Sequence, residues 1–143
     1  MSTDASAAGP PPVWVQRLLW IDGLSGVTVG VAVLVLAVPL ARWYGLPHGV
    51  VVMIGTANVG YGAFSTSLAA SARRRMGLLK LLVAANLAWC FVASALLVRF
   101  GGDATWLGCG HIAGEGVFVA VLGALEWRWR SALVGRGEIS GGR

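Results

Sequence analysis

Charged residues are scarce in this chain. Asp, Glu, Lys and Arg make up 12% of its 143 residues, whereas an ordinary soluble domain contains about 25%. Hydrophobic residues make up 57%, and the mean hydropathy is +0.75. This composition excludes an ordinary soluble domain. It is typical of a multi-pass membrane protein with room for about four spans of roughly 20 residues each.

The residues that mark common catalytic and cofactor sites are also missing. The chain has two cysteines, Cys90 and Cys109, each in an apolar segment, and no CxxC motif. We therefore expect both to be small packing residues and not a disulfide framework. No GxSxG, phosphate-binding loop or dinucleotide fingerprint occurs. The sequence favours a non-enzymatic protein without a cofactor, and a membrane enzyme or redox protein is a third alternative.

The net charge of +5 raises the question of a nucleic-acid partner. The basic residues lie at the ends of apolar segments, where they orient helices in a membrane and contact anionic lipid headgroups. A nucleic-acid module needs a basic face with exposed aromatics on a soluble scaffold. No part of the chain is left to form one, so we expect the lipid bilayer as partner and no nucleic acid.

Four apolar segments are long enough to cross a bilayer. They are predicted at about residues 18–40, 50–70, 78–98 and 105–126. Because the connections between them are short, consecutive helices should be antiparallel neighbours. The expected fold is all-α, an up-down antiparallel four-helix transmembrane bundle over residues 14–130. Residues 1–13 are expected to form a disordered tail that is not a signal peptide, and residues 131–143 a cytoplasmic tail.

The distribution of Lys and Arg predicts the orientation. If the N-terminus is cytoplasmic, nine of the eleven basic residues lie on the cytoplasmic side. This places both termini in the cytoplasm. Six of the seven tryptophans lie near predicted span ends, as an aromatic belt requires, and Trp89 is the exception. Roles in topology or headgroup contact are assigned to Arg73, Arg74, Arg75, Lys80, Arg128 and Arg130.

Small residues predict close contacts between the helices. Asp22, Gly26 and Gly30 are four residues apart and share one helical face. Gly26 and Gly30 form a small-xxx-small pair that lets a neighbouring helix approach. Pro39 should kink or end the first span near its last turn. A second stripe, too polar for lipid, should face inward and consists of Gly55, Asn58, Gly62 and Ser65.

Five polar residues lie inside the predicted spans, where a central acid costs about 2.5 to 3.5 kcal/mol. His111 and Glu115 are one turn apart in the last span, on a stripe that also holds Leu122. Gly110 and Gly114 are expected to form a close-packing edge beside that stripe. The five candidates for a ligand or proton site are Asp22, Asn58, Asn86, His111 and Glu115.

Two interpretations of Glu115 stay open at the sequence level. In one, Glu115 exchanges a proton or binds a ligand, and His111 relays the proton. In the other, Glu115 accepts a hydrogen bond from Asn58 or Asn86 and only clasps the helices together. Asp22 is either a partner of Glu115 in a proton path or an acid near the interface that pairs with a cytoplasmic Arg or with backbone.

Two side-chain pairs have the spacing of a metal site or an ion pair. His111 and Glu115 could contribute two metal ligands, but a metal site needs three or four. Asp22 is expected at a different depth, so we predict no metal site. Glu126 and Arg130 are spaced i, i+4 and are predicted to pair in the headgroup region.

The chain resembles a widespread set of small four-span bacterial inner-membrane proteins to which no activity is assigned. The resemblance rests on LLWIDGLSG around Asp22, on AANLAW with Asn86 and Trp89, and on GHIAGEGVFVAVLGALEWR with Glu115 and Glu126. It covers most of residues 14–130. It implies a multi-pass protein of the bacterial inner (plasma) membrane.

The sequence leads to two functional hypotheses. The first is a non-enzymatic structural, accessory or sensing subunit with a buried polar clasp. The second is a proton-coupled transporter of small molecules that works as a dimer, with Glu115 as the proton-exchanging acid. Either would be compatible with a homo-oligomer or a larger membrane complex.

Overall fold

The computed structural model describes residues 13–71 and 75–134, and nearly all of these residues are helical. This part of the chain contains no strand. The elements in chain order are α1 (Val13–Val35), α2 (Ala37–Tyr44), α3 (His48–Ala70), α4 (Met76–Phe100), α5 (Trp106–Arg128) and α6 (Arg130–Val134).

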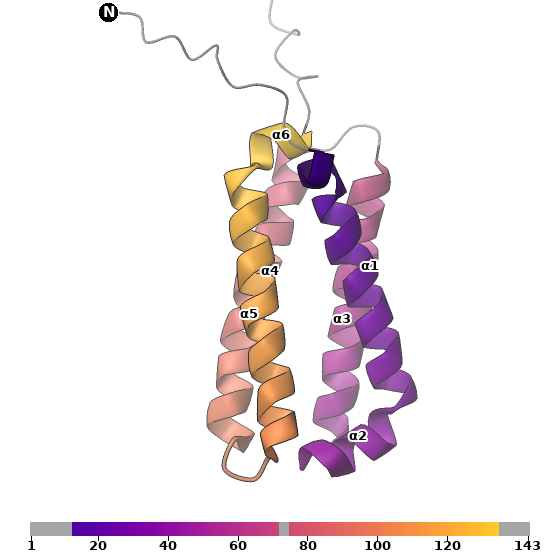
Figure 1. The fold of residues 1–143 in the computed structure, drawn as a ribbon, viewed down its shortest axis with the longest axis vertical. Coiled ribbons are helices and arrows are strands. Elements are labelled where there is room, and N and C mark those ends of the chain that lie inside the picture. The colour runs from indigo at the N-terminus through magenta and orange to yellow at the C-terminus, as the bar shows by residue number, and fades with distance from the viewer. Residues whose placement is uncertain (1–12, 72–74, 135–143) are drawn as a thin grey trace, which may run out of the picture.

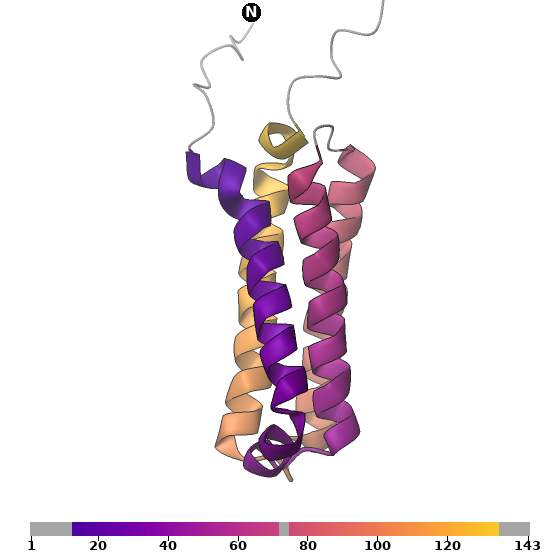
Figure 2. The ribbon, with the colours of Figure 1, turned by 90° about the vertical axis from the view of Figure 1, so that its right-hand side faces the viewer.

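The long helices α1, α3, α4 and α5 lie side by side along the long axis (Figures 1 and 2). α1 packs mainly against α3, and α4 packs mainly against α5, so the protein consists of two helix pairs. The start of α1 and α6 lie at one end, which we call the α6 end. α2 and the turn between α4 and α5 lie at the opposite end, which we call the α2 end (Figure 1).

Three helical segments are long and apolar enough to cross a membrane. They are Arg17–Val35, Met76–Phe100 and Trp106–Arg128. Large apolar side chains on them point away from the protein, for example Phe91 at 78% exposure and Val98 at 89%. Lipid acyl chains would cover such an apolar surface favourably, whereas its exposure to water would be unfavourable. α3 is not among the three, because its many small and polar residues lower its hydropathy.

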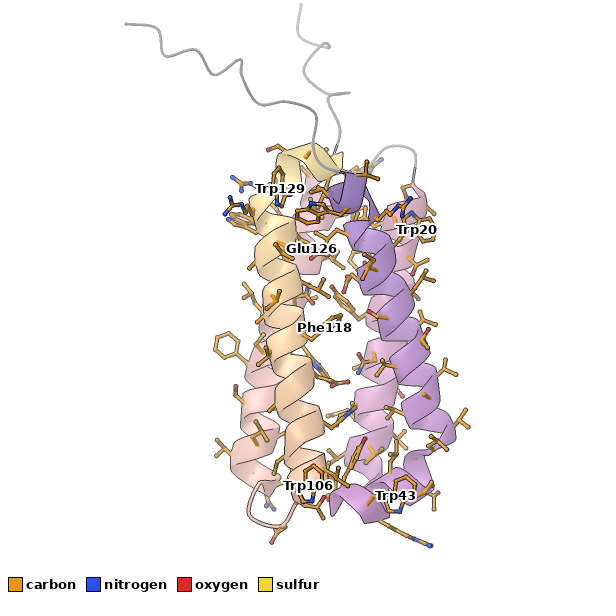
Figure 3. All side chains as sticks on the ribbon, viewed as in Figure 1. Trp20, Trp43, Trp106, Phe118, Glu126 and Trp129 are labelled. Carbon is orange, nitrogen blue, oxygen red and sulfur yellow. The ribbon has the colours of Figure 1, made fainter. Side chains whose placement is uncertain are left out.

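Tryptophans other than Trp89 lie toward the two ends of the helices. Figure 3 places Trp20 and Trp129 at the α6 end, and Trp43 and Trp106 at the α2 end. Trp43 and Trp106 are highly exposed, at 62% and 81%. An indole ring combines an apolar body with an N–H donor, so these positions suit the two membrane–water interfaces.

The first predicted span is not one helix over residues 18–40. α1 ends at Val35, and α2 begins at Ala37 with a change of direction visible in Figure 1. Pro39 lies four residues after Val35, so it cannot donate a hydrogen bond to the Val35 carbonyl and its ring would crowd that carbonyl. The proline therefore interrupts the helix at Leu36, earlier than its own position suggests.

The end of α2 is joined to the start of α5. The Thr105 hydroxyl donates a hydrogen bond of 2.7 Å to the Trp43 carbonyl, and the Thr105 amide donates one of 2.8 Å to the Tyr44 carbonyl. Gly108 lies against Tyr44, where a Cβ atom would clash with the backbone. The interrupted helix thus anchors the fourth long helix through backbone contacts.

The ends of the chain differ from the expected tails. The helix already begins at Val13, and α6 extends over part of the predicted C-terminal tail. Leu133 is only 2% exposed and packs with Val15 and Leu18 of α1. A short C-terminal helix therefore covers the α6 end. The predicted tails and headgroup contacts also involve residues outside the described ranges, namely 1–12, Arg73, Arg74 and 135–143.

Glycines bring the backbones of α1 and α3 together, as predicted. A Cβ atom on Gly26 would lie 3.1 Å from the Cα atom of Gly62, and one on Gly30 would lie 2.6 Å from the Val59 nitrogen. The predicted role of Gly110 and Gly114 is wrong. Both are exposed, and a Cβ atom on either would meet no atom within 4 Å. They line open space and form no packing edge.

The apolar core is divided into two clusters, one at each end. The cluster at the α6 end includes Leu19, Leu68 and Leu82, and the cluster at the α2 end includes Ile54 and Ile112. Between them, the interior holds most of the buried polar side chains. The inward stripe of α3 follows this pattern, because Gly55, Gly62 and Ser65 are buried and Asn58 is partly buried.

Replacing Gly62 by Ala should destabilise the protein. The added Cβ atom would lie 2.7 Å from the Gly23 carbonyl oxygen, which is backbone and cannot move aside. We expect a loss of about 1–3 kcal/mol in unfolding free energy, measured by thermal or denaturant unfolding in detergent. Gly60→Ala is the matched control, since a Cβ there meets no atom within 4 Å. Equal losses for both variants would contradict the close α1–α3 contact.

Candidate functional site

Glu115 is held by Asn58 near the middle of the helices. Asn58 of α3 donates a 2.8 Å hydrogen bond from Nδ2 to Glu115 Oε1 on α5. The same amide donates its second proton to the Ile54 carbonyl at 3.1 Å. His111 lies one turn from Glu115, with 3.5 Å between His111 Nε2 and Glu115 Oε1. The predicted clasp therefore forms with Asn58, and it joins the two helix pairs.

Aromatic rings complete the surroundings of His111 and Glu115. Tyr44 stacks on the His111 imidazole with 5.1 Å between ring centroids and an angle of 26° between planes. The Trp89 indole lies near the Glu115 carboxyl group. Trp89 is the one tryptophan that does not fit an interfacial belt, and its position beside this acid accounts for the exception.

Asp22 is buried inside the protein. Its side chain is 2% exposed. The Tyr61 hydroxyl donates a 2.7 Å hydrogen bond to Asp22 Oδ2. The carboxyl group of Glu126 also lies within hydrogen-bonding reach of Asp22. Within the described part of the chain, then, the alternative in which Asp22 pairs with an Arg is not observed, and its partners come from α3 and α5.

Glu126 does not pair with Arg130, so that prediction is wrong. Glu126 is fully buried at 0% exposure, and it accepts a 3.1 Å hydrogen bond from Asn86 Nδ2. Arg130 lies over the Trp127 ring at 4.5 Å and donates to the Trp127 carbonyl. Glu126 lies near the α6 end of α5 (Figure 3) and faces the interior, where it contacts Asn86 and lies near Asp22.

The pair formed by Asp22 and Glu126 leaves polar atoms to be accounted for. Glu126 Oε1 and Asn86 Oδ1 are buried and have no hydrogen-bond donor among the described residues. Two carboxylate groups are both acceptors, so they can form a hydrogen bond only when one of them carries a proton.

The role of Glu126 could have been found in the sequence. Glu126 follows Glu115 by eleven residues, which is about three turns at 3.6 residues per turn. It also follows Leu122 by four residues, so it continues the stripe of His111, Glu115 and Leu122. The alternative i, i+4 spacing to Arg130 concealed this signal. Tyr61 carried a weaker signal, since a tyrosine in an apolar helix needs a partner for its hydroxyl.

A cavity of about 370 Å³ connects Asp22 with Glu115. It lies between α1, α3 and α5, and its walls are mainly apolar. A smaller cavity of about 180 Å³ lies on the other side of Asn58 and Tyr61 and reaches Asn86 and Trp89. The larger cavity is lined by Asp22, Ser25, Gly26, Val29, Asn58, Tyr61, Gly110, His111, Gly114, Glu115, Phe118 and Val119.

The remaining assigned residues lie away from this cavity. Arg75, Lys80 and Arg128 are exposed, which suits contact with lipid headgroups. Cys90 and Cys109 are free thiols. No group of three or more His, Cys, Asp or Glu residues that could hold a metal ion occurs among residues 13–71 and 75–134. Of the five predicted site residues, the structure brings Asp22, Asn58, His111 and Glu115 to one cavity, and Asn86 to its neighbour.

The chain matches no family model, no curated protein and no solved structure.

Replacing Glu126 by Ala should cost more stability than replacing Arg130 by Ala. Loss of the carboxyl group leaves the buried Asn86 amide without an acceptor, at about 1–3 kcal/mol. The Arg130 side chain donates to the carbonyl and lies over the ring of Trp127, a neighbour on the same stretch of chain, so its removal should change the unfolding free energy little. Chemical denaturation in detergent measures both. Equal effects would indicate that the two residues act as a surface ion pair.

Proposed function

We propose that this protein is a non-enzymatic membrane protein that binds a small amphipathic molecule in the cavity between α1, α3 and α5. One observation carries the proposal: a cavity of about 370 Å³ within the membrane-spanning part holds two acids, the buried Asp22 and the partly buried Glu115. A volume in the range of about 300–1,000 Å³ with apolar walls and a few polar groups is typical of a small-molecule site.

The proposed setting is a four-span bundle in the bacterial inner membrane with both termini in the cytoplasm. α3 has 23 residues, as α5 does, and it lies along α1. Three of its polar residues, Asn58, Tyr61 and Ser65, are partly or fully buried, which is why a span can have a lower hydropathy here. Basic residues are more numerous toward the α6 end, so the positive-inside rule would place that end in the cytoplasm.

The Asn58–Glu115 hydrogen bond suggests how binding could be sensed. It connects α3 of one helix pair with α5 of the other. Bonds of this kind between membrane helices contribute only about 0.6–2 kcal/mol. A ligand that competes for Glu115 would therefore change the connection between the pairs at modest cost. An accessory or sensing subunit needs a change of this kind, which a partner subunit could detect.

Filling the cavity should abolish binding without unfolding the protein. A Cβ atom on Gly114 meets no atom within 4 Å, so the Gly114→Leu side chain can enter the cavity without a backbone clash. Thermal unfolding in lipid nanodiscs, with a panel of small cationic, neutral and anionic aromatic compounds, measures binding through stabilisation of the folded state. At least one compound should raise the melting temperature of the wild type and not that of Gly114→Leu.

The control for this experiment is Gly60→Leu. Gly60 is exposed on α3, does not line the cavity, and has the same open surroundings. Its variant should respond to the compound as the wild type does. If Gly114→Leu and Gly60→Leu respond alike, the compound binds elsewhere and the proposed binding cavity is rejected.

Proton-coupled transport is the second candidate. It is favoured by the position of acids at two levels of one cavity. Asp22 is nine residues from the α6 end of α1, and Glu115 is thirteen residues from the α6 end of α5. Because one cavity of this size offers a short path, a second copy of the chain would have to complete the route. A dimer would serve that purpose.

The Glu115→Gln variant separates a clasp from a proton-exchanging acid. Glutamine keeps an oxygen acceptor for Asn58 Nδ2 and removes titration at this position. The variant should fold and keep its unfolding free energy within about 0.5 kcal/mol of the wild type, as expected when a hydrogen bond is retained. If Glu115 exchanges protons, the pH dependence of ligand binding in nanodiscs should disappear. An unchanged pH profile would leave Glu115 as a clasp.

A further inference from the structure

We propose that the cavity between α1, α3 and α5 selects a small organic cation with an apolar body, such as an alkyl or aryl amine. This inference rests on the proposed binding function and adds the chemical class of the ligand. It depends on three features of the cavity: the charges of its side chains, the supply of hydrogen-bond donors and acceptors, and the direction of its opening.

Acids predominate among the ionisable side chains of the cavity. Asp22, Glu115 and one histidine, His111, line it, and no Lys or Arg is among its lining residues. His111 Nε2 lies 3.5 Å from Glu115 Oε1. An anion would meet two acids in a medium of low dielectric constant, where like charges repel strongly. A cation would gain attraction from the same groups and offset its loss of hydration. The basic residues of the described ranges that are exposed at helix ends are Arg17, Arg42, Arg75, Lys80, Arg99 and Arg128.

The cavity offers acceptors, because its amide and hydroxyl donors are already engaged. The exception among its polar groups is His111 Nε2, which has no hydrogen-bond partner among the described residues. Asn58 Nδ2 donates both protons, to Ile54 and Glu115, and the Tyr61 hydroxyl donates to Asp22. The Ser25 hydroxyl donates to the Asp22 carbonyl at 2.9 Å. A carboxylate has about four lone-pair sites, so Asp22 and Glu115 each keep capacity for another donor. A ligand with N–H groups or a fixed positive charge matches this supply.

Aromatic and apolar walls suit the body of such a cation. Tyr61 and Phe118 present rings to the cavity, and a ring face attracts a cation within about 6 Å. Val29, Gly26 and Val119 provide apolar surface for the rest of the molecule. A fully hydrated inorganic ion would gain nothing from these walls.

The cavity opens to the side and not along the helix axis. Val29 is 39% exposed and Phe118 is 47% exposed, and both belong to helices that are long and apolar enough to span a membrane. Figure 3 places Phe118 about midway along α5. The two apolar clusters cover the ends of the interior. A ligand would therefore enter from the acyl chains, which requires an apolar body.

The test compares three probes of similar shape on the full-length protein in lipid nanodiscs. The probes are benzyltrimethylammonium, its neutral carbon isostere neopentylbenzene, and the anion benzenesulfonate. Equilibrium binding is measured against empty nanodiscs, which correct for partition into lipid. The wild type should bind the cation at least about tenfold more tightly than the isostere, and it should not bind the anion.

Variants that remove one charge test the role of the acids. Glu115→Gln and Asp22→Asn should each weaken binding of the cation by about tenfold, since a buried charge is lost with little change of shape. Asp103→Asn removes an exposed acid in the turn between α4 and α5 and should leave binding unchanged.

The outcomes test the cation class of the ligand separately from ligand binding in the cavity. Equal affinity for benzyltrimethylammonium and neopentylbenzene overturns the cation class and leaves ligand binding intact. Failure of all three probes to bind the wild type also overturns it, and the comparison of Gly114→Leu with Gly60→Leu then judges the binding function separately. If an acid variant does not fold, the selectivity of the wild type among the three probes still decides the question.

Discussion

The packing of α1 against α3 brings backbone against backbone, with a Cβ on Gly26 only 3.1 Å from the Gly62 Cα atom. Lipid supplies no hydrophobic force between helices, so close van der Waals contact of this kind is what holds a membrane helix pair together. The second pair packs through side chains, for example Asn86 against Gly123. The surface between the pairs is packed less tightly. The polar groups and both cavities lie there, and this division gives the protein a place to bind something without disturbing its two stable halves.

Hydrogen bonds and carboxyl contacts connect the halves between the middle of the protein and the α6 end (Figure 3). Asn86 on α4 donates to Glu126 on α5, which faces Asp22 on α1, which accepts from Tyr61 on α3. This chain of contacts passes through all the long helices. Asn58 adds a second connection through Glu115. Polar groups in hydrocarbon must find partners inside the protein, so these contacts determine how the pairs meet, while each contributes only modest stability.

The sequence predicted the helical class, the inward face of α3 and the glycine contact of α1, because each follows from residue type and helical period. It named Asn58 and Asn86 as possible partners of Glu115, and the observed partner is Asn58. It failed where two periodic partners competed. Glu126 could face Arg130 or continue the stripe of Glu115, and only tertiary contact with Asn86 decides between them. Gly110 and Gly114 could mean contact or empty space, since a missing side chain allows both. Pro39 was recognised as a helix breaker, but the position of the break depends on the carbonyl four residues earlier.

The hydrogen bonds of Thr105 to the end of α2 fix where α5 begins. A rigid-body tilt of α5 would therefore turn about Thr105. Glu115 is ten residues from Thr105, about 15 Å at 1.5 Å per residue, and Glu126 is about twice as far. A tilt of α5 that shifts Glu115 slightly would shift Glu126 by about double that amount. The contact between Asp22 and Glu126 is consequently the part of the interior that responds most to a small movement at the Glu115 end of the cavity.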